Sequence, residues 1–176
     1  MNCTRTRGKK SDRHADPADP PRRRANNQRG HGTFANDRPP IFSVVSRDTG
    51  AIRYVVCDQA TKETCRAIVA TYVPPTGTVF YTDEWSGYRD VHPVHGTVCH
   101  SAREWARDDD GDGYREVHCN TCEGWGTTLR TFLRSFRGVH KAYLACYVAV
   151  FEMVANAKRI TPEVVRRMCY GKAICT

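Results

Sequence analysis

Three side chains that carry oxygen are placed in the sequence as ligands of a divalent metal ion would be. Asp83 closely follows an apolar run at residues 79–81, so a carboxylate stands at the end of a predicted buried strand. Magnesium requires oxygen ligands that are held rigidly, and it keeps water and substrate phosphates in its remaining positions. A pair of such ions clamps the attacking and leaving oxygens of an in-line displacement. The candidate partners of this carboxylate are Asn120 and Glu123. Between Asp83 and Asn120 lie 36 residues.

The segment 120–136 places these two candidates on the polar side of a predicted helix. At ~100° per residue, one face of this helix is apolar. It consists of Trp125, Leu129, Phe132, Leu133 and Phe136. The polar side consists of Asn120, Glu123, Thr127, Arg130, Arg134 and Arg137. Its three arginines repel one another at a cost of a few tenths of a kcal/mol per pair. Phosphate groups of a partner would remove that cost; a solvated charged stripe is the general alternative.

The elements that must position these residues follow from hydrophobic periodicity and from turn residues. A β-hairpin is predicted from its two apolar runs, Ile41–Ser46 and Ile52–Cys57. A helix within residues 59–73 and the strand Thr78–Thr82 follow. Residues 92–113 are predicted to be irregular, with a short strand at Tyr114–His118. Further helices are predicted at Asn120–Phe136, at Val139–Lys158 and from Thr161. Strands followed by helices are typical of a layered α/β domain.

The basic charge of the chain is concentrated in its first 40 residues. The net charge is +8, and residues 1–40 hold ten Lys/Arg against four Asp/Glu. This segment is rich in Pro, Arg and Asn without periodicity, which predicts an extended or disordered arm. Its cluster Arg22, Arg23 and Arg24 is predicted to contact a phosphate backbone without reading sequence, with a flexible soluble loop as the alternative. The charge favours nucleic acid over a membrane surface as the partner.

Two other motifs suggest metal sites but match them poorly. DDDGDG at residues 108–113 fits the first positions of an EF-hand loop, but its twelfth position is Cys119 rather than Glu. Cys119 and Cys122 form a single C-x-x-C, whereas zinc ribbons usually carry two such pairs. We therefore favour a solvated acidic turn and packed thiols. His100 and His118 either border the active site or are ordinary hydrogen-bonded histidines.

Several motifs, in their order and spacing, resemble the catalytic domain of insertion-sequence transposases of the ISXO-like branch. They are YTDEWSGY at 81–88, the segment 97–124 around HSA and VHCNTCEG, and LRTFLRSFRGVHKAYL at 129–144. The resemblance covers about residues 14–170 and implies an RNase H-like fold, DDE-type chemistry and Mg²⁺ or Mn²⁺ as the cofactor. It makes Asp83 the second catalytic Asp and Asn120 the third member, with Glu123 its neighbour in the same motif. Arg130 stands where many relatives carry Lys. Contact with phosphate would then come from a planar guanidinium with a fork of N–H groups, instead of from an ammonium that acts as a point charge.

The first catalytic Asp of such enzymes belongs to a D-E-x-Y motif, which this sequence does not contain. Residues 1–10, MNCTRTRGKK, can be back-translated into a DNA sequence. When one G is added in front of this DNA and the reading frame starts at that base, the DNA encodes DELYQNAGKK. We therefore expect that Met1 to about Lys10 is an out-of-frame reading of the first catalytic strand. The same truncation would remove the zinc-ribbon and helix-turn-helix regions that related transposases often carry. Without the first carboxylate, a two-metal site should be severely impaired.

Together these observations predict an RNase H-like mixed α/β domain at residues 41–170 behind a basic arm at residues 1–40. The expected function is transposition of a small mobile element, with cleavage of a DNA strand followed by strand transfer. The expected partner is DNA, with no membrane, and the active form is expected to be a homo-oligomer in the cytoplasm, associated with the nucleoid. The competing hypothesis is a catalytically dead remnant that still binds DNA.

Overall fold

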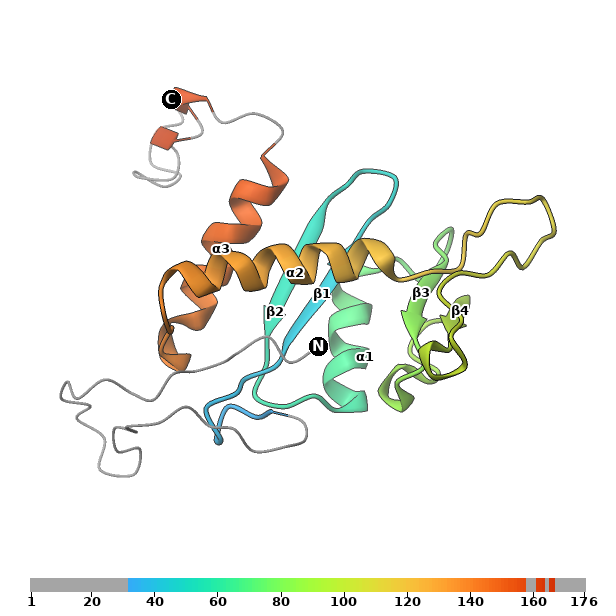
Figure 1. Ribbon diagram of the computed structural model, residues 1–176, viewed down its shortest axis with the longest axis horizontal. Helices are drawn as coiled ribbons and strands as arrows, with labels where there is room; N and C mark the ends of the chain where they lie inside the picture. The colour runs from blue at the N-terminus through green and yellow to red at the C-terminus, as the bar shows by residue number, and fades with distance from the viewer. Residues whose placement is uncertain (1–31, 158–160, 164, 167–176) are drawn as a thin grey trace.

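The computed structural model of the protein describes residues 32–157, 161–163 and 165–166 (Figure 1). It begins with an antiparallel hairpin of β1 (Ile41–Val45) and β2 (Ile52–Val56), in which Ile41 pairs with Val56. Gly50 closes the turn with a φ of 71°, a conformation that costs little only for a residue without Cβ. The predicted hairpin is therefore confirmed.

Three helices follow, and each begins or ends close to its predicted position. They are α1 (Lys62–Tyr72), α2 (Asn120–Ser135) and α3 (Lys141–Asn156). Thr61 caps α1, since its Oγ1 accepts a 3.1 Å hydrogen bond from the N–H of Thr64. Residues 162–163 and 165–166 are also helical, close to the predicted start at Thr161.

The hairpin lies between two groups of helices because successive side chains of a strand point to opposite faces. On one face, Ile41, Ile52 and Tyr54 form the main core with α2 and α3. The helices contribute Leu129, Leu133, Leu144, Val148 and Phe151. On the other face, Phe42 and Val44 pack on α1, against Cys65, Val69 and Val73. The mixed α/β class is thus confirmed, with the hairpin as the middle layer.

One residue predicted for the core face of α2 is at its edge instead. Phe136 is the residue after the last turn of α2 and exposes 43% of its surface. Its ring contacts Tyr147 with centroids 4.7 Å apart, so it covers the margin of the core. Because α2 ends at Ser135, helical spacing no longer determines the position of Phe136, and this residue does not lie on the apolar face that the spacing predicted for it.

A second small sheet carries the residues that follow the hairpin and α1. It pairs β3 (Phe80–Asp83) with β4 (His95–Val98) in parallel, and Asp83 lies opposite Val98. The prediction of an irregular segment was wrong for β4, because His-Gly-Thr-Val carries no alternating apolar pattern and becomes a strand by pairing with β3. The predicted strand Tyr114–His118 was also wrong. Only Val117 forms a bridge, to Arg107.

The segment before the hairpin packs on the domain as far back as the structure describes it. Thr33 forms a bridge with Gln59, and the carboxylate of Asp37, which is 4% exposed as a residue, pairs with Lys141 at 3.1 Å. Residues 32–40, which the sequence placed in the irregular arm, therefore belong to the packed region. The cluster Arg22, Arg23 and Arg24 lies outside the described residues.

The outer edge of β2 is closed by side chains of α3. The amide of Asn156 accepts a hydrogen bond from Ile52 N and donates one to Ile52 O, both at 2.8 Å. Glu152 accepts the N–H of Tyr54 at 2.7 Å. These side chains replace the hydrogen bonds that a neighbouring strand would make. Within the described residues no helix has the length and apolarity needed to cross a membrane.

Candidate metal and DNA site

Asp83 is the last residue of β3 and is half-buried. Its Oδ1 accepts a hydrogen bond from the N–H of Trp85 at 3.2 Å, which fixes the turn that leaves the strand. The Trp85 ring packs edge-on against Tyr88 with centroids 5.0 Å apart. Gly87 lies directly under this ring, since a Cβ there would be 2.3 Å from it. The turn therefore holds the Asp83 carboxylate by packing as well as by a hydrogen bond.

Asn120 and Glu123 lie in the first turn of α2, as their spacing predicted. Asn120 is the first helical residue and is exposed, while 46% of the Glu123 side chain is exposed. The N–H of Glu123 donates to the carbonyl of Cys119 at 3.1 Å. Carboxylates near a helix N-terminus are stabilised by the exposed N–H groups and by the helix dipole. The helix start is consequently a suitable place for the charged form of Glu123.

The closest neighbours of the Glu123 carboxylate are a histidine and a thiol. His100 lies in the short helix η2 (His100–Ala102), directly after β4 and Cys99. Its Nε2 is 3.5 Å from Oε1 of Glu123 and 3.2 Å from Sγ of Cys119. The third distance, from Sγ of Cys119 to Oε1 of Glu123, is 3.8 Å. His100 therefore lies next to Glu123, one of the residues predicted for the site.

Electrostatics connect Asp83 with the same cluster. Burial, followed by the negative charges of Glu123 and Asp83, raises the pKa of the Cys119 thiol to about 11. Asp83 on β3 and Glu123 on α2 therefore act on one thiol, although 39 residues separate them in the chain. Contacts bring the two predicted acids into one region, because Glu84, next to Asp83, accepts hydrogen bonds from Ser101, and the adjacent His100 lies 3.5 Å from Glu123.

The two cysteines of the C-x-x-C motif have different surroundings, and among the described residues only Cys119 belongs to a group of possible metal ligands. Sγ of Cys119 faces His100 and Glu123, whereas Cys122 lies near Ser43 and Val45 of β1. Burial raises the pKa of Cys122 as well. For Cys122 the interpretation as a packed thiol fits the structure, and Cys119 has the different surroundings just described.

Arg47, at the end of β1, holds the segment that leads into α2. Its guanidinium donates hydrogen bonds to the carbonyls of Glu116 and His118 and lies 4.5 Å above the ring centroid of Tyr81 in β3. It thereby joins the hairpin, β3 and the start of α2. Sequence reasoning missed this residue, because its partners lie 34 to 71 positions away and leave no local pattern.

Replacing Arg47 with Ala is expected to loosen the entry to α2. We expect a loss of about 1–2 kcal/mol in the free energy of unfolding, because two exposed hydrogen bonds from a charged donor and one cation–π contact disappear. Urea unfolding measures the loss, and faster amide exchange at residues 116–123 would locate it. The control is Arg53→Ala in the same hairpin, which removes an ion pair with Glu152 instead. This variant should leave amide exchange at residues 116–123 unchanged. Equal exchange in both variants would contradict the role of Arg47.

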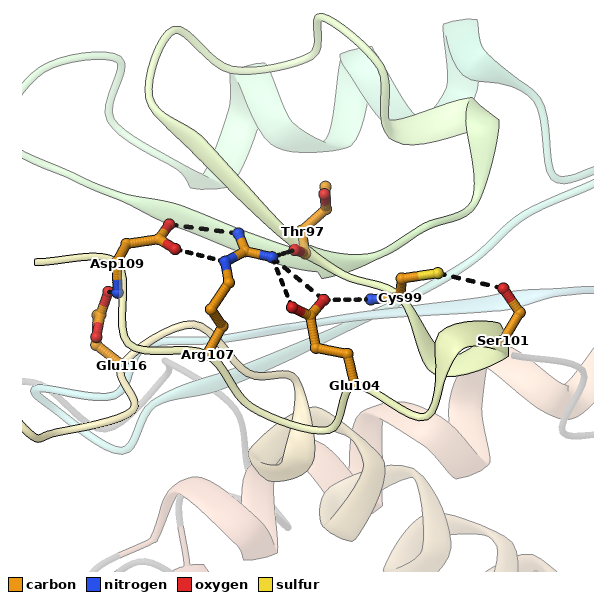
Figure 2. A network of polar contacts seen from close by, with 7 residues as sticks. All are labelled: Thr97, Cys99, Ser101, Glu104, Arg107, Asp109 and Glu116. Carbon is orange, nitrogen blue, oxygen red and sulfur yellow. Dashed lines mark hydrogen bonds and ion pairs between the residues drawn. The ribbon is translucent and has the colours of Figure 1, made fainter. Parts of the chain in front are cut away.

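A polar network fixes the loop that carries His100 (Figure 2). Arg107 donates to the carbonyl of Thr97 in β4 at 3.0 Å and pairs with the carboxylates of Glu104 and Asp109. Glu104 in turn accepts the N–H of Cys99 at 2.9 Å, directly before His100. Hydrogen bonds from the N–H of Cys99 and from Arg107 lower the pKa of Glu104 below its ordinary range, and hydrogen bonds from Cys99 and Ser101 lower that of Glu84. The position of His100 is thus tied to β4.

The acidic turn at residues 108–113 uses its carboxylates to bind its own backbone. Asp108 accepts the N–H groups of Gly111 and Gly113, and Asp110 accepts that of Asp112. These bonds order a turn that is largely exposed. Oxygens of Asp108, Asp110 and Glu116 also lie within 4.8 Å of one another.

The arginines of α2 differ in their surroundings. Arg130 is half-buried and donates from Nε to the carbonyl of Gly126 at 3.0 Å. Arg134 is exposed near the end of α2, and Arg137 follows the helix with a φ of 56°. Among the aromatic rings of this region, Trp85 and Tyr88 pack against each other, whereas Trp105 exposes 59% of its surface.

Comparison with known proteins gives a consistent family assignment. The family described as the ISXO2-like transposase domain matches residues 13–156. The chain is also 33% identical, over 135 residues, to a protein of Halobacterium salinarum named as an uncharacterized protein in transposable element ISH50. This alignment covers 76% of the chain and 44% of the relative, so the chain spans less than half of that protein. No solved structure matches the chain.

Proposed function

The chain belongs to the ISXO2-like transposase family, and on this basis we propose that it provides the metal-binding part of a transposase that cleaves and joins DNA strands. The reaction is attack of water on a phosphodiester, followed by attack of the freed 3′-hydroxyl on a second phosphodiester. The observation that supports this most directly is a chain of contacts between β3 and α2: Glu84, next to Asp83, accepts hydrogen bonds from Ser101, and the adjacent His100 lies 3.5 Å from Glu123.

The residues fit a hard divalent ion in part. Asp83 uses Oδ1 in its turn, Glu123 is nearly half-exposed, and Asn120 is exposed beside it, so oxygen donors from two elements are accessible. We propose that Asp83 holds Mg²⁺ or Mn²⁺ together with Glu123 or Asn120. Bound metal supplies Lewis-acid stabilisation of phosphoryl oxygens and lowers the pKa of water. Arg130, Arg134 and Arg137 orient the DNA by its phosphates.

We propose further that the two small sheets are parts of one RNase H-like sheet that lacks a strand between β1 and β3. Phe42 and Val44 of β1 and Phe80 of β3 pack on the same helix, α1. In the described part of the chain, the two sheets share no hydrogen-bonded pair of strands. The first catalytic Asp would lie on such a strand, and the sequence contains no D-E-x-Y motif. The domain predicted at residues 41–170 would then also include the packed residues 32–40, and the basic segment before them, with Arg22, Arg23 and Arg24, would be the DNA-binding arm.

The missing carboxylate also supports the alternative of a DNA-binding remnant without cleavage activity. In a test, residues 1–10 are replaced by DELYQNAGKK, and Mg²⁺-dependent nicking of DNA that carries the element ends is measured for both chains. We expect the original chain to bind DNA without cleaving it and the altered chain to gain cleavage. Binding by both chains without any cleavage would leave only the remnant.

We propose that the active form is a homo-oligomer bound to DNA and that it is located in the cytoplasm with the nucleoid.

Replacing both Arg134 and Arg137 with Gln is expected to weaken DNA binding in a manner that depends on salt. Each lost phosphate contact should reduce the slope of log K against log salt by about 0.9, so the double variant should lose about 1.8. Fluorescence anisotropy with duplex DNA over a range of salt concentrations measures the slope. The double variant Arg66→Gln, Arg89→Gln removes the same charge from exposed positions elsewhere. A similar change of slope in both would show that only net charge matters.

A further inference from the structure

We propose that His100, Cys119 and Glu123 form a binding site for zinc or a divalent ion of similar softness. The three ligand atoms come from two separate elements, η2 and the start of α2, and all lie within 4.8 Å of one another. This site goes beyond the proposed function, since hard magnesium selects oxygen ligands whereas imidazole and thiolate suit zinc.

The distances among the three atoms are close to those in a tetrahedral zinc site. Zinc bonds of about 2.3 Å to sulfur and about 2.0–2.2 Å to nitrogen and oxygen place tetrahedral neighbours about 3.4–3.6 Å apart. The observed distances are 3.2 Å between Nε2 and Sγ, 3.5 Å between Nε2 and Oε1, and 3.8 Å between Sγ and Oε1. Shifts of a few tenths of an ångström would therefore suffice to place one ion among them.

The backbone holds these ligands in place from both sides. Cys119 and Glu123 are four residues apart at the helix start, so their side chains share a face, and the Glu123 N–H binds the Cys119 carbonyl. His100 is held from the other side, because Glu84 accepts hydrogen bonds from the N–H and the hydroxyl of Ser101, each at 3.3 Å. The ring of Trp105 covers His100 with centroids 5.0 Å apart. A site whose ligands are fixed before binding loses little entropy when the ion enters.

The donor set determines how such a site would behave. Three protein ligands leave a fourth position for water or another group, as in zinc sites that exchange ligands. The thiol must lose its proton to bind, so affinity should rise with pH. Glu123 is also a candidate ligand of the magnesium proposed above. Zinc at this site would withdraw that carboxylate and should inhibit any cleavage that depends on magnesium.

The test is a cobalt and zinc titration of the full chain after removal of metal with a chelator. Cobalt serves as the spectroscopic probe, because a bound thiolate gives a charge-transfer absorption that water and carboxylates do not. We expect this band to saturate at one equivalent and zinc to abolish it. Cys119→Ser should remove the band and weaken zinc binding by about 100-fold or more, at least as much as loss of a metal's outer-shell partner does.

Cys122→Ser is the matched control, since Cys122 lies on the same helix and faces β1. It should bind zinc within about twofold of the original chain, and so should Cys146→Ser at an exposed position. Glu123→Gln provides a second variant of nearly unchanged volume, and it should weaken zinc binding while the thiolate band persists. Circular dichroism checks that each variant folds. Equal losses for Cys119→Ser and Cys122→Ser, or no thiolate band at one equivalent, would overturn the proposal.

The outcome is separable from that of the proposed function. Asp83→Asn should leave the cobalt band intact, because Asp83 is not among the three ligands. A cobalt site in a chain that carries DELYQNAGKK at its start and still cleaves no DNA would support the zinc site and contradict the catalytic proposal. DNA cleavage without a cobalt site would support the catalytic proposal and contradict the zinc site.

Discussion

Replacing Asp83 with Asn is expected to abolish DNA cleavage by the chain that carries DELYQNAGKK at its start. The amide keeps the size of the side chain but removes the charge that would hold a divalent ion. Metal ions stabilise such transition states by several kcal/mol, so the rate should fall by at least about 10³-fold. DNA binding should be almost unchanged, since Asp83 carries no positive charge and is half-buried at the end of β3. Nicking rates and anisotropy measured on the same preparation test both statements.

The control for this variant is Asp90→Asn, the same substitution seven residues further along. Asp90 is exposed and contacts Lys62 at 3.3 Å, an ion pair that solvent screens. Its replacement should leave cleavage within about twofold, as expected for a change away from the chemistry. If Asp83→Asn retained more than a tenth of the rate, the metal role of Asp83 would be refuted.

Leu129→Ala is expected to cause the largest loss of stability among single substitutions in α2. Leu129 is 1% exposed and packs against Ile41, Ile52 and Tyr54 of the hairpin. Truncation removes buried methyl groups and leaves a cavity, which should cost about 3 kcal/mol and lower the melting temperature by roughly 10 °C. Urea unfolding followed by circular dichroism measures the change.

The control is Val150→Ala in α3, where the side chain is 46% exposed. Its effect should be within about 0.5 kcal/mol, as for other surface substitutions. Because Asn120 and Glu123 lie on the helix that Leu129 anchors, the core variant should also weaken metal and DNA binding at temperatures near its melting point. A Leu129 variant as stable as the control would contradict the described packing of α2 on the hairpin.

Elements with a strong local signal were predictable from sequence. The hairpin has two apolar runs around Gly50, and α2 has an apolar stripe that ends in Leu133. The strand β4 could not be predicted, since its hydrogen bonds to β3 come from tertiary structure and its four residues have no pattern. The same limit applies to Phe136, whose exposure depends on where α2 ends rather than on helical spacing.

The site was predictable only as far as it follows spacing along one element or family resemblance. Asn120 and Glu123 were identified as neighbours on a helix, and Asp83 as the end of a strand. The contact of His100 with Cys119 depends on how η2 folds back from β4, and 19 positions separate the two residues. Arg47 depends on still longer contacts. Neither could be derived without the fold.

The closure of β2 by α3 has a consequence for the behaviour of the protein in concentrated solution. An open strand edge invites a strand from another molecule, which is a common beginning of aggregation. Asn156 binds the N–H and the carbonyl of Ile52, and Glu152 accepts the N–H of Tyr54, so these three backbone groups are not available to an intruding strand. Sheet growth is thereby directed to the side of β1 that faces β3. Solubility during expression should accordingly improve when a strand fills that side, whether or not it carries a catalytic residue.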